Sequence, residues 1–437
     1  MRIEKDKLGE VQLEADALYG IQTARAAKNF ALKYKKTEIS LIRAIVLVKK
    51  AAALTYIKLG TGKEEVYPAI VRACDYILAG AADEAFITDA LQGGAGTSTN
   101  MNVNEVIANL ALKEHKYPCG RYDVIHPLDD VNRGQSTNDV YPTALRIAAI
   151  QMLRTLSENC AQLQQELQLK ENAFDEIKKL GRTEMMDAVP ITLGQEFGAY
   201  AQAIARDRWR LYKVEERLRQ VNIGGTAVGS GDNAERKYRY KVIEELRDLT
   251  GIGLAVAEYP MDITQNNDVF VEVSGLLKAL AVNLLKIAND LRLMNSGPKG
   301  GLGEISLEPL QLGSTIMPGK INPVIPEMVM QTAMKVIAND TAITMAAAHG
   351  EFELNAFMPL IADSLIENLE LLTAATELFR TKCISSLQPN IERCRQLLDL
   401  SYAFATAFAP ALGYDKVSAI IEESAGNIDA AKKLLKV

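Results

Sequence analysis

Several apolar patterns of helical period in this chain are longer than 25 residues, and few folds can accommodate them. The longest begins near Tyr141 and continues towards Leu180, which corresponds to a helix of roughly 40 residues and about 60 Å. Others cover residues 194–221, 269–295 and 357–384. Strand-like alternation of apolar and polar residues is scarce. Because long amphipathic helices bury their apolar stripes by packing side by side, we expect an all-α fold with a bundle of long helices in the middle of the chain.

Shorter helical patterns precede and follow this central region. Apolar residues recur at helical spacing over residues 40–60 and again over residues 68–78. Beyond residue 390 the chain has two or three short patterns, with breaks at Gly413 and Gly426. We therefore expect shorter helices on both sides of the bundle.

Composition and charge limit the partners of this 437-residue chain. Lys and Arg number 49 and Asp and Glu number 55, so the net charge is −6, and neither sign forms long runs. This balance argues against nucleic acid or an anionic membrane as the main partner. Residues 1–7 contain no apolar signal region and no stretch reaches roughly 18 uninterrupted apolar residues, so we expect a soluble, cytoplasmic protein. The five cysteines are an odd number without a C-x-x-C pair, which favours reduced, mostly buried thiols.

Residues 313–323 form a polar segment with several chemically active groups. The segment lies between two helical patterns, and its two glycines and two prolines cannot continue either helix, so we expect a loop. Two hydroxyls, one ammonium and one carboxamide lie close together in it, on Ser314, Thr315, Lys320 and Asn322. These groups suit an anion such as a carboxylate. The alternative is a solvated connector with a lone lysine. We favour a binding loop because three other polar segments carry similar chemistry.

Two segments rich in glycine and hydroxyl groups open helical patterns. Residues 92–102, which include Thr97, lead into a helical run over residues 103–112, and residues 134–139 precede the longest pattern. The second segment contains Ser136, Thr137, Asn138 and Asp139. Backbone N–H groups and the positive end of the helix dipole bind anions at such positions. Simple capping is the alternative, but it needs only one of the four polar residues in the second segment. We do not expect a dinucleotide site, because no strand precedes the glycines and their spacing is not G-x-G-x-x-G.

A fourth polar segment, residues 181–190, is expected to be a loop between two long helices and contains Thr183 and Glu184. Long helices hold their ends tens of ångströms apart, so one chain need not bring the four segments together, whereas association of identical chains can. Together the candidate residues of the four segments supply one cation, several hydroxyls and two amides, beside helix N-termini. The three histidines lack metal-site spacing, and we expect neither a metal nor a cofactor. This set suits a small dicarboxylate and acid–base or electrostatic chemistry.

These segments resemble the site motifs of the aspartase/fumarase superfamily. Residues 313–323 are similar to its signature loop, Gly-Ser-Ser-x-Met-Pro-x-Lys-x-Asn. Residues 19–25, 94–102, 134–139 and 181–190 are similar to other segments of the family, in the same order and at the same spacing. The resemblance covers nearly the whole chain. Within the superfamily, the stretches Gly-Ala-Gly-Thr-Ser and Gln-Ser-Thr-Asn-Asp are more similar to the aspartate ammonia-lyases than to the fumarases.

The resemblance implies a mainly α, three-domain chain that assembles into a homotetramer, with each active site shared by three subunits. The implied domains are an N-terminal mostly helical domain over residues 1–137, a central helical bundle over residues 138–392 and a short C-terminal helical domain over residues 393–437. The implied reaction converts L-aspartate to fumarate and ammonia without a cofactor. A serine would remove the proton, and the intermediate would be an aci-carboxylate.

The resemblance also implies roles for individual residues. Ser314 would be the general base, with Lys320 as the second catalytic residue. The implied substrate-binding residues are Thr97, Ser136, Thr137, Asn138, Thr183, Glu184, Thr315 and Asn322. The first three of these would bind the carboxylate that becomes doubly charged, and Asn138 would contact the amino group. Lys320, Asn322 and Thr183 would hold the other carboxylate. A proton beside a carboxylate is barely acidic, so donors aimed at the enediolate oxygens must lower most of the barrier.

The chain departs from the family pattern at two places. Glu184 stands where the family has His or Gln, and a carboxylate there can pair with a cationic amine, which favours C–N over C–O chemistry. The alternative is that Glu184 turns away to pair with Arg182 or another cation. The second departure is a tail shorter than the family's C-terminal domain. A lyase for an N-substituted aspartate, a class II fumarate hydratase and a non-catalytic helical assembly are the alternatives to an aspartate ammonia-lyase.

Overall fold

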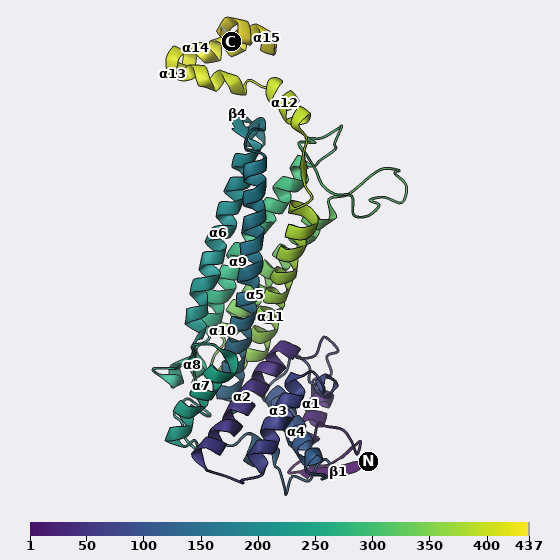
Figure 1. Cartoon of the computed structure of the whole chain (residues 1–437), viewed down its shortest axis with the longest axis vertical. Coiled ribbons are helices and arrows are strands. Elements are labelled where there is room, and N and C mark those ends of the chain that lie inside the picture. The colour runs from purple at the N-terminus through teal and green to yellow at the C-terminus, as the bar shows by residue number, and fades with distance from the viewer. Residues whose placement is uncertain (436–437) are drawn as a thin grey trace. The chain divides into compact units, whose positions relative to one another are not determined.

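Helices dominate the computed structural model, which describes residues 1–435 (Figure 1). Within these residues the strands are short and form four two-stranded sheets. The all-α class predicted from the helical periodicities is therefore confirmed. The chain divides into two compact units, each built from separate stretches of sequence. Unit 1 contains Met1–Thr155, Arg210–Lys278 and Val336–Leu371, and unit 2 contains Leu156–Trp209, Ala279–Lys335 and the chain from Leu372 onward.

Five long helices correspond to the bundle predicted for the middle of the chain (Figure 1). They are α5 (Thr137–Ala173), α6 (Leu193–Leu218), α9 (Asp268–Met294), α10 (Val324–Ala348) and α11 (Met358–Phe379). In unit 1, Ser274 Oγ of α9 donates to Asp340 Oδ1 of α10 at 2.7 Å. In unit 2, Asn283 Nδ2 of α9 donates to Asp207 Oδ2 of α6 at 2.7 Å. Within each unit, segments of these helices therefore pack against one another.

The longest helix is shorter than predicted, and the loop expected after it is a hairpin. α5 ends at Ala173, and Lys178–Thr183 (β3) pairs antiparallel with Met186–Thr192 (β4). The Lys179 side chain on β3 is buried and its Nζ lies 3.0 Å from Glu304 Oε2. Local periodicity predicted a helix here, whereas strand pairing and an ion pair with a residue far along the sequence hold the backbone extended.

Unit 1 carries the N-terminal elements. They are β1 (Arg2–Asp6), β2 (Gly9–Leu13), α1 (Ile21–Asn29), α2 (Ile39–Leu59), α3 (Val66–Leu78), η1 (Asp83–Ala85), α4 (Thr97–Glu114) and η2 (Pro127–Val131). Later in the chain the same unit contains β5 (Gln220–Val221), α7 (Arg236–Thr250), β6 (Ala255–Val256) and α8 (Pro260–Gln265). The helices predicted over residues 40–60 and 68–78 are α2 and α3. The run predicted over residues 103–112 belongs to α4, which begins earlier, at Thr97.

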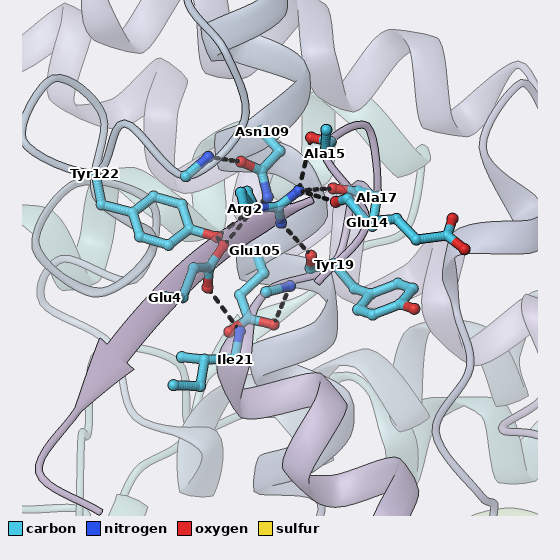
Figure 2. Close-up of polar contacts among 12 residues, drawn as sticks. Arg2, Glu4, Glu14, Ala15, Ala17, Tyr19, Ile21, Glu105, Asn109 and Tyr122 are labelled. Atoms are coloured by element: carbon cyan, nitrogen blue, oxygen red, sulfur yellow. Dashed lines mark hydrogen bonds and ion pairs between the residues drawn. The ribbon is translucent and has the colours of Figure 1, made fainter. Parts of the chain in front are cut away.

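A network of polar groups fixes residues 19–25 at the start of α1 (Figure 2). The Arg2 guanidinium donates to four backbone carbonyl oxygens between residues 14 and 19, including that of Tyr19 at 2.7 Å. The buried Glu105 carboxylate of α4 accepts hydrogen bonds from the N–H groups of Gly20, Gln22 and Thr23. These N–H groups at the start of a helix have no intrahelical partner, so Glu105 caps α1 and ties it to α4.

Unit 2 contains the β3–β4 hairpin and the C-terminal elements. The latter are β7 (Ile305–Ser306), η3 (Arg380–Ile384), β8 (Gln388–Pro389), α12 (Ile391–Asp399), η4 (Ala403–Phe408), α13 (Ala409–Leu412), α14 (Tyr414–Glu423) and α15 (Ile428–Leu435). The predicted breaks at Gly413 and Gly426 are confirmed, with φ values of 87° and 86°. A small cluster of Ala405, Val417 and Leu435 is buried between the short helices. The division of the chain into three domains stays a prediction.

All five cysteines are free and buried, as their number and spacing predicted. Burial raises the pKa of the Cys394 thiol to about 11. A buried thiol with a raised pKa is a poor nucleophile, because the thiolate is the reactive form. Among the described residues, no helix combines the length and the apolar character that crossing a membrane requires.

Candidate active site

A cavity of about 570 Å³ in unit 1 is lined by four of the residues predicted to bind substrate. They are Thr97, Ser136, Thr137 and Asn138. Thr97 is the first residue of α4 and Thr137 is the first residue of α5, so two helix N-termini meet at one cavity. The free N–H groups and positive dipole ends of both helices favour a bound anion there.

Gly96 determines where α4 begins. Its φ of +92° lies in the left-handed region, and a Cβ atom at this position would collide with the ring of Tyr141. Only glycine fits such a close approach in this conformation. The next residue, Thr97, is exposed at the cavity and its hydroxyl donates to Gly94 O at 2.7 Å.

Asp139 caps α5. Its carboxylate accepts hydrogen bonds from the N–H groups of Ser136 at 2.9 Å, Gly224 at 3.0 Å and Thr226 at 2.9 Å. The side chain is fully buried, and burial raises the pKa of Asp139 to about 7 against the opposing effect of these hydrogen bonds. The capping alternative is therefore correct for Asp139, which is a structural residue.

Thr137 and Asn138 keep hydrogen-bonding capacity for a ligand. Asn100 Nδ2 donates to Thr137 Oγ1 at 3.1 Å, so the Thr137 hydroxyl accepts that bond and its own hydrogen can point to another acceptor. Asn138 Nδ2 donates to Ala227 O at 2.7 Å, which leaves Asn138 Oδ1 as an acceptor. A hydroxyl donor suits a carboxylate and an amide oxygen suits an amine, and the roles implied for Thr137 and Asn138 stay predictions.

The unit 1 cavity has no cationic lining. In the part of the chain that the structure describes, Asp232 is the only charged residue that lines it. The cavity therefore offers neutral donors and helix dipoles to one carboxylate. A doubly charged ligand needs a cation from elsewhere to offset the loss of its hydration.

A second cavity, of about 750 Å³, lies in unit 2 and is lined by Lys320 and Asn322. Arg292 lines it as well, together with the carboxylates of Glu308 and Glu327. This cavity thus contains the cations that the unit 1 cavity lacks. An ammonium, a guanidinium and a carboxamide are donors that suit a carboxylate.

The predicted loop over residues 313–323 is present, and it holds Ser314 in a distinctive geometry. The N–H groups of Ile316 and Met317 both donate to Ser314 Oγ, at 3.2 Å and 2.9 Å. Asn322 Nδ2 donates to Gly313 O at 3.0 Å and closes the loop. Two N–H donors on one hydroxyl oxygen stabilise negative charge on it, as an alkoxide base requires. Thr315 is exposed in the same turn.

Thr183 and Glu184 lie at the tip of the β3–β4 hairpin. Glu184 and Met185 form the two-residue turn, with φ values of 53° and 67°. This type of turn favours Asn and Gly, so two other residues in the left-handed region indicate local strain. Arg182 Nη1 lies 2.9 Å from Glu304 Oε1, so the predicted alternative pairing of Glu184 with Arg182 is wrong. The exposed Glu184 carboxylate has no polar partner within residues 1–435.

Sequence reasoning missed a layer of amides beside the hydroxyls of the unit 1 cavity. Asn100, Asn132 and Gln135 also line this cavity. Behind them lies Lys49, which is fully buried on α2. The signal that could have revealed it is a lysine directly after the apolar positions Val46 and Val48 of a strongly apolar helix, since an unpaired lysine rarely occurs in a core.

The predicted residues fall into three groups. Thr97, Ser136, Thr137 and Asn138 surround the unit 1 cavity. Lys320 and Asn322 line the unit 2 cavity, and Ser314 and Thr315 belong to the same loop as these two. Thr183 and Glu184 occupy the hairpin tip of unit 2.

Comparison with known proteins relates the whole chain to lyases. The sequence profile of a protein family described as "Lyase" matches residues 9–338. An aspartate ammonia-lyase from Pseudomonas aeruginosa is 46% identical over 426 residues, which are 96% of this chain and 89% of that protein. The solved structure of a fumarate lyase:delta crystallin from Brucella melitensis is 44% identical with a TM-score of 0.95, and covers 100% of this chain and 96% of its own. A class II fumarase from Schistosoma mansoni is 31% identical with a TM-score of 0.96, over 100% of this chain and 95% of its own. The chain therefore belongs to the lyase family of the aspartase/fumarase superfamily.

Proposed function

We propose that this chain is an aspartate ammonia-lyase that converts L-aspartate to fumarate and ammonia. The observation that carries the proposal is the meeting of two helix N-termini with Thr97, Ser136 and Thr137 at one cavity, which fits a carboxylate that gains charge. Relatives at 44% identity or more that bear the name aspartate ammonia-lyase support the choice of substrate, whereas the class II fumarase is 31% identical.

In the proposed mechanism, the Ser314 alkoxide takes a proton from the carbon next to the amine-bearing carbon. The N–H groups of Ile316 and Met317 stabilise this alkoxide before the reaction, and the positive charge of Lys320 in the same loop favours it. The electron pair of the C–H bond passes into the adjacent carboxylate, which becomes a doubly charged aci-carboxylate. It then returns to form the C=C bond while the C–N electron pair leaves with nitrogen as ammonia. The serine proton passes to solvent.

The proposed site places a different group of residues on each part of the substrate. Thr97, Ser136 and Thr137 donate to the aci-carboxylate, where charge develops, and so lower the barrier. Lys320, Asn322, Thr183 and Thr315 hold the other carboxylate. The Asn138 amide oxygen accepts from the amine, and Glu184 offers it a negative charge.

We further propose that identical chains associate as a homotetramer and share each active site among three subunits. Support comes from the complementary linings of the two cavities: within residues 1–435 the unit 1 cavity is lined by hydroxyls and amides and by no cation, whereas Lys320 lines a cavity of unit 2. Mixing two inactive variants tests this proposal. Ser314→Ala and Thr137→Val tetramers, dissociated and reassociated together, should regain part of the activity because some sites receive both intact residues from different chains. Each variant reassociated alone is the control, and a mixture as inactive as the controls would contradict shared sites.

The reaction itself is tested with purified protein and a panel of substrates read by the ultraviolet absorbance of fumarate. L-Aspartate should give a rising signal, and L-malate should give little or none.

A specific observation favours one second candidate, a lyase for an N-substituted aspartate. The unpartnered Glu184 carboxylate would suit a larger or more basic amine. Turnover of an N-substituted aspartate without turnover of L-aspartate would select that candidate and reject the first.

We also propose that the enzyme works in the cytoplasm. Support comes from the five free, buried cysteines, because reduced thiols are typical of that compartment. Cell fractionation with detection of the native chain tests this proposal, and recovery in a membrane or extracellular fraction would contradict it.

A further inference from the structure

We propose that Lys49 is a positioning residue of the unit 1 cavity, which holds the amide layer in place and supplies positive charge from behind it. This inference rests on the proposed function, because it concerns the carboxylate that gains charge during the reaction. It adds a residue that touches neither the substrate nor the reacting atoms and acts through Asn132, Gln135 and Asn100.

The Lys49 ammonium lies directly behind the cavity lining. The Lys49 side chain on α2 is fully buried, and its Nζ donates to Asn132 Oδ1 at 2.8 Å and to Gln135 Oε1 at 3.0 Å. Asn132 and Gln135 both line the cavity. One layer of side-chain amides therefore separates the cation from any bound ligand.

The contact with Lys49 fixes the orientation of the amides, since only an amide oxygen can accept from an ammonium. Asn132 Oδ1 also accepts from Asn100 Nδ2 and Asn104 Nδ2, each at 3.2 Å. The same Asn100 Nδ2 donates to Thr137 Oγ1 at 3.1 Å. Asn100 thereby uses its donors on Asn132 and Thr137, and the Thr137 hydroxyl hydrogen stays available for the ligand.

The amide layer also holds the backbone that leads into α5. Asn132 Nδ2 donates to Gln135 O at 3.1 Å, and Gln135 Nε2 donates to Val131 O at 3.1 Å. These bonds join the two ends of the short segment immediately before Ser136. Lys49 therefore acts on both the side chains and the backbone of the proposed carboxylate site.

The charge of Lys49 has no direct counterion, which points to an anionic ligand. Within residues 1–435, Lys49 forms no ion pair. Burial lowers the pKa of Lys49 to about 7, although the field of the buried Asp139 opposes this effect. A buried cation without a paired anion is costly, and a methionine of similar size would pack without that cost. A carboxylate in the cavity, and still more an aci-carboxylate with a second negative charge, would offset it.

The test compares two dianions that differ in how much negative charge the two oxygens at the critical position carry. Succinate has two ordinary carboxylates, whereas the ionised nitronate of 3-nitropropionate has a second negative oxygen where the aci-carboxylate has one. We expect Lys49→Met to reduce kcat for L-aspartate by about 100-fold, comparable to the loss of one donor to a developing oxyanion, and to change KM much less. The preference for nitronate over succinate, measured by calorimetry, should fall by at least about 10-fold.

Two further variants keep the test decisive. Lys58→Met removes another cation from α2, one that pairs with Glu245 away from the cavity lining, and should leave kcat and the anion preference unchanged. Asn132→Asp keeps Lys49 in place but sets a carboxylate between its charge and the cavity. We expect this variant to lose the nitronate preference even if Lys49→Met fails to fold. Circular dichroism and thermal melting establish which variants are folded.

The outcomes separate this inference from the proposed function. Wild-type levels of kcat and of nitronate preference in either folded variant would overturn the role of Lys49 and leave the aspartate reaction intact. Suppose that the wild-type protein binds both anions and that the variants change as expected, but that the wild type does not turn over L-aspartate. This result would support the role of Lys49 and overturn L-aspartate as the substrate. A wild-type protein that binds neither anion would overturn both.

Discussion

At the residue scale, the site combines neutral donors with a few charges whose surroundings differ. Ser314 Oγ accepts from two N–H groups, Thr137 keeps a free hydroxyl hydrogen, and Glu184 has no polar partner in the described chain. Asp139 belongs to the same sequence cluster as Thr137 but is buried in capping bonds. Neighbouring polar residues of one motif thus serve either chemistry or structure, according to where each side chain points.

Replacement of the proposed base gives the first prediction. Ser314→Ala removes the hydroxyl that accepts from Ile316 and Met317, so we expect kcat to fall by about 10²-fold to 10⁴-fold, the usual contribution of a general base. Fumarate binding should persist, because Ser314 does not line the cavity that contains Lys320. Steady-state kinetics and calorimetry measure the two quantities. Equal losses in turnover and in fumarate affinity would assign Ser314 to binding.

Neutralising the exposed carboxylate gives the second prediction. If Glu184 contacts the substrate amine, Glu184→Gln should raise KM for L-aspartate by about 10-fold. This factor is at the lower end of the range for losing a hydrogen bond to a charged group. Affinity for fumarate, which has no amine, should stay the same or increase. Asp187→Asn on the same hairpin is the matched control, since Asp187 is also exposed. Parallel changes for aspartate and fumarate would argue against contact with the amine.

At the element scale, close packing at helix starts determines where the ligand groups lie. α4 begins at Thr97 because Gly96 adopts a left-handed conformation against the Tyr141 ring, and α5 begins at Thr137 because Asp139 binds the N–H group of Ser136. Each helix therefore starts at the cavity. The β3–β4 hairpin similarly places Thr183 next to a strained two-residue turn.

Two glycines of one loop give the third prediction, and they form a matched pair. Gly94 and Gly96 have similar φ values, 85° and 92°, but only the second would place a Cβ against the Tyr141 ring. A Cβ at Gly94 would meet Thr97 at an ordinary 3.9 Å. Gly94→Ala should therefore cost about 1–2 kcal/mol for the conformation alone, and Gly96→Ala should cost clearly more. Thermal melting and kcat/KM check this order, and equal effects of the two changes would contradict it.

At the scale of the whole molecule, the donors for a dicarboxylate are divided between two compact units. Hydroxyls and amides belong to unit 1, and the Ser314 and Lys320 loop belongs to unit 2. One site for a dicarboxylate needs donors from both of these sets. Association of identical chains is the proposed means.

The fourth prediction follows from that association. If each site needs several chains, the activity per mole of chain should fall as the protein is diluted below the dissociation constant of the assembly. Activity measured over a dilution series, with sedimentation at the same concentrations, checks this dependence. Adding succinate should shift the fall to lower concentration, because a ligand that binds only the assembled form stabilises it. Constant activity in a monomeric sample would contradict shared sites.

The helical fold and the chemistry of the four polar segments follow from the sequence alone. Helical periodicity over 25 residues or more leaves few alternatives to long packed helices, and polar segments that contain glycine and lie beside helices predict anion sites.

Tertiary structure alone decided three other features. Residues 178–183 are a strand rather than the end of a helix, because their partners are β4 and the distant Glu304. Asp139 is a cap and not a ligand, because its carboxylate faces Gly224 and Thr226. Lys49 stands behind the cavity because α2 packs its apolar face into the core and carries the ammonium to Asn132 and Gln135. Local patterns report what each segment can form, whereas contacts between residues far apart in the sequence decide which groups are buried together and which reach a ligand.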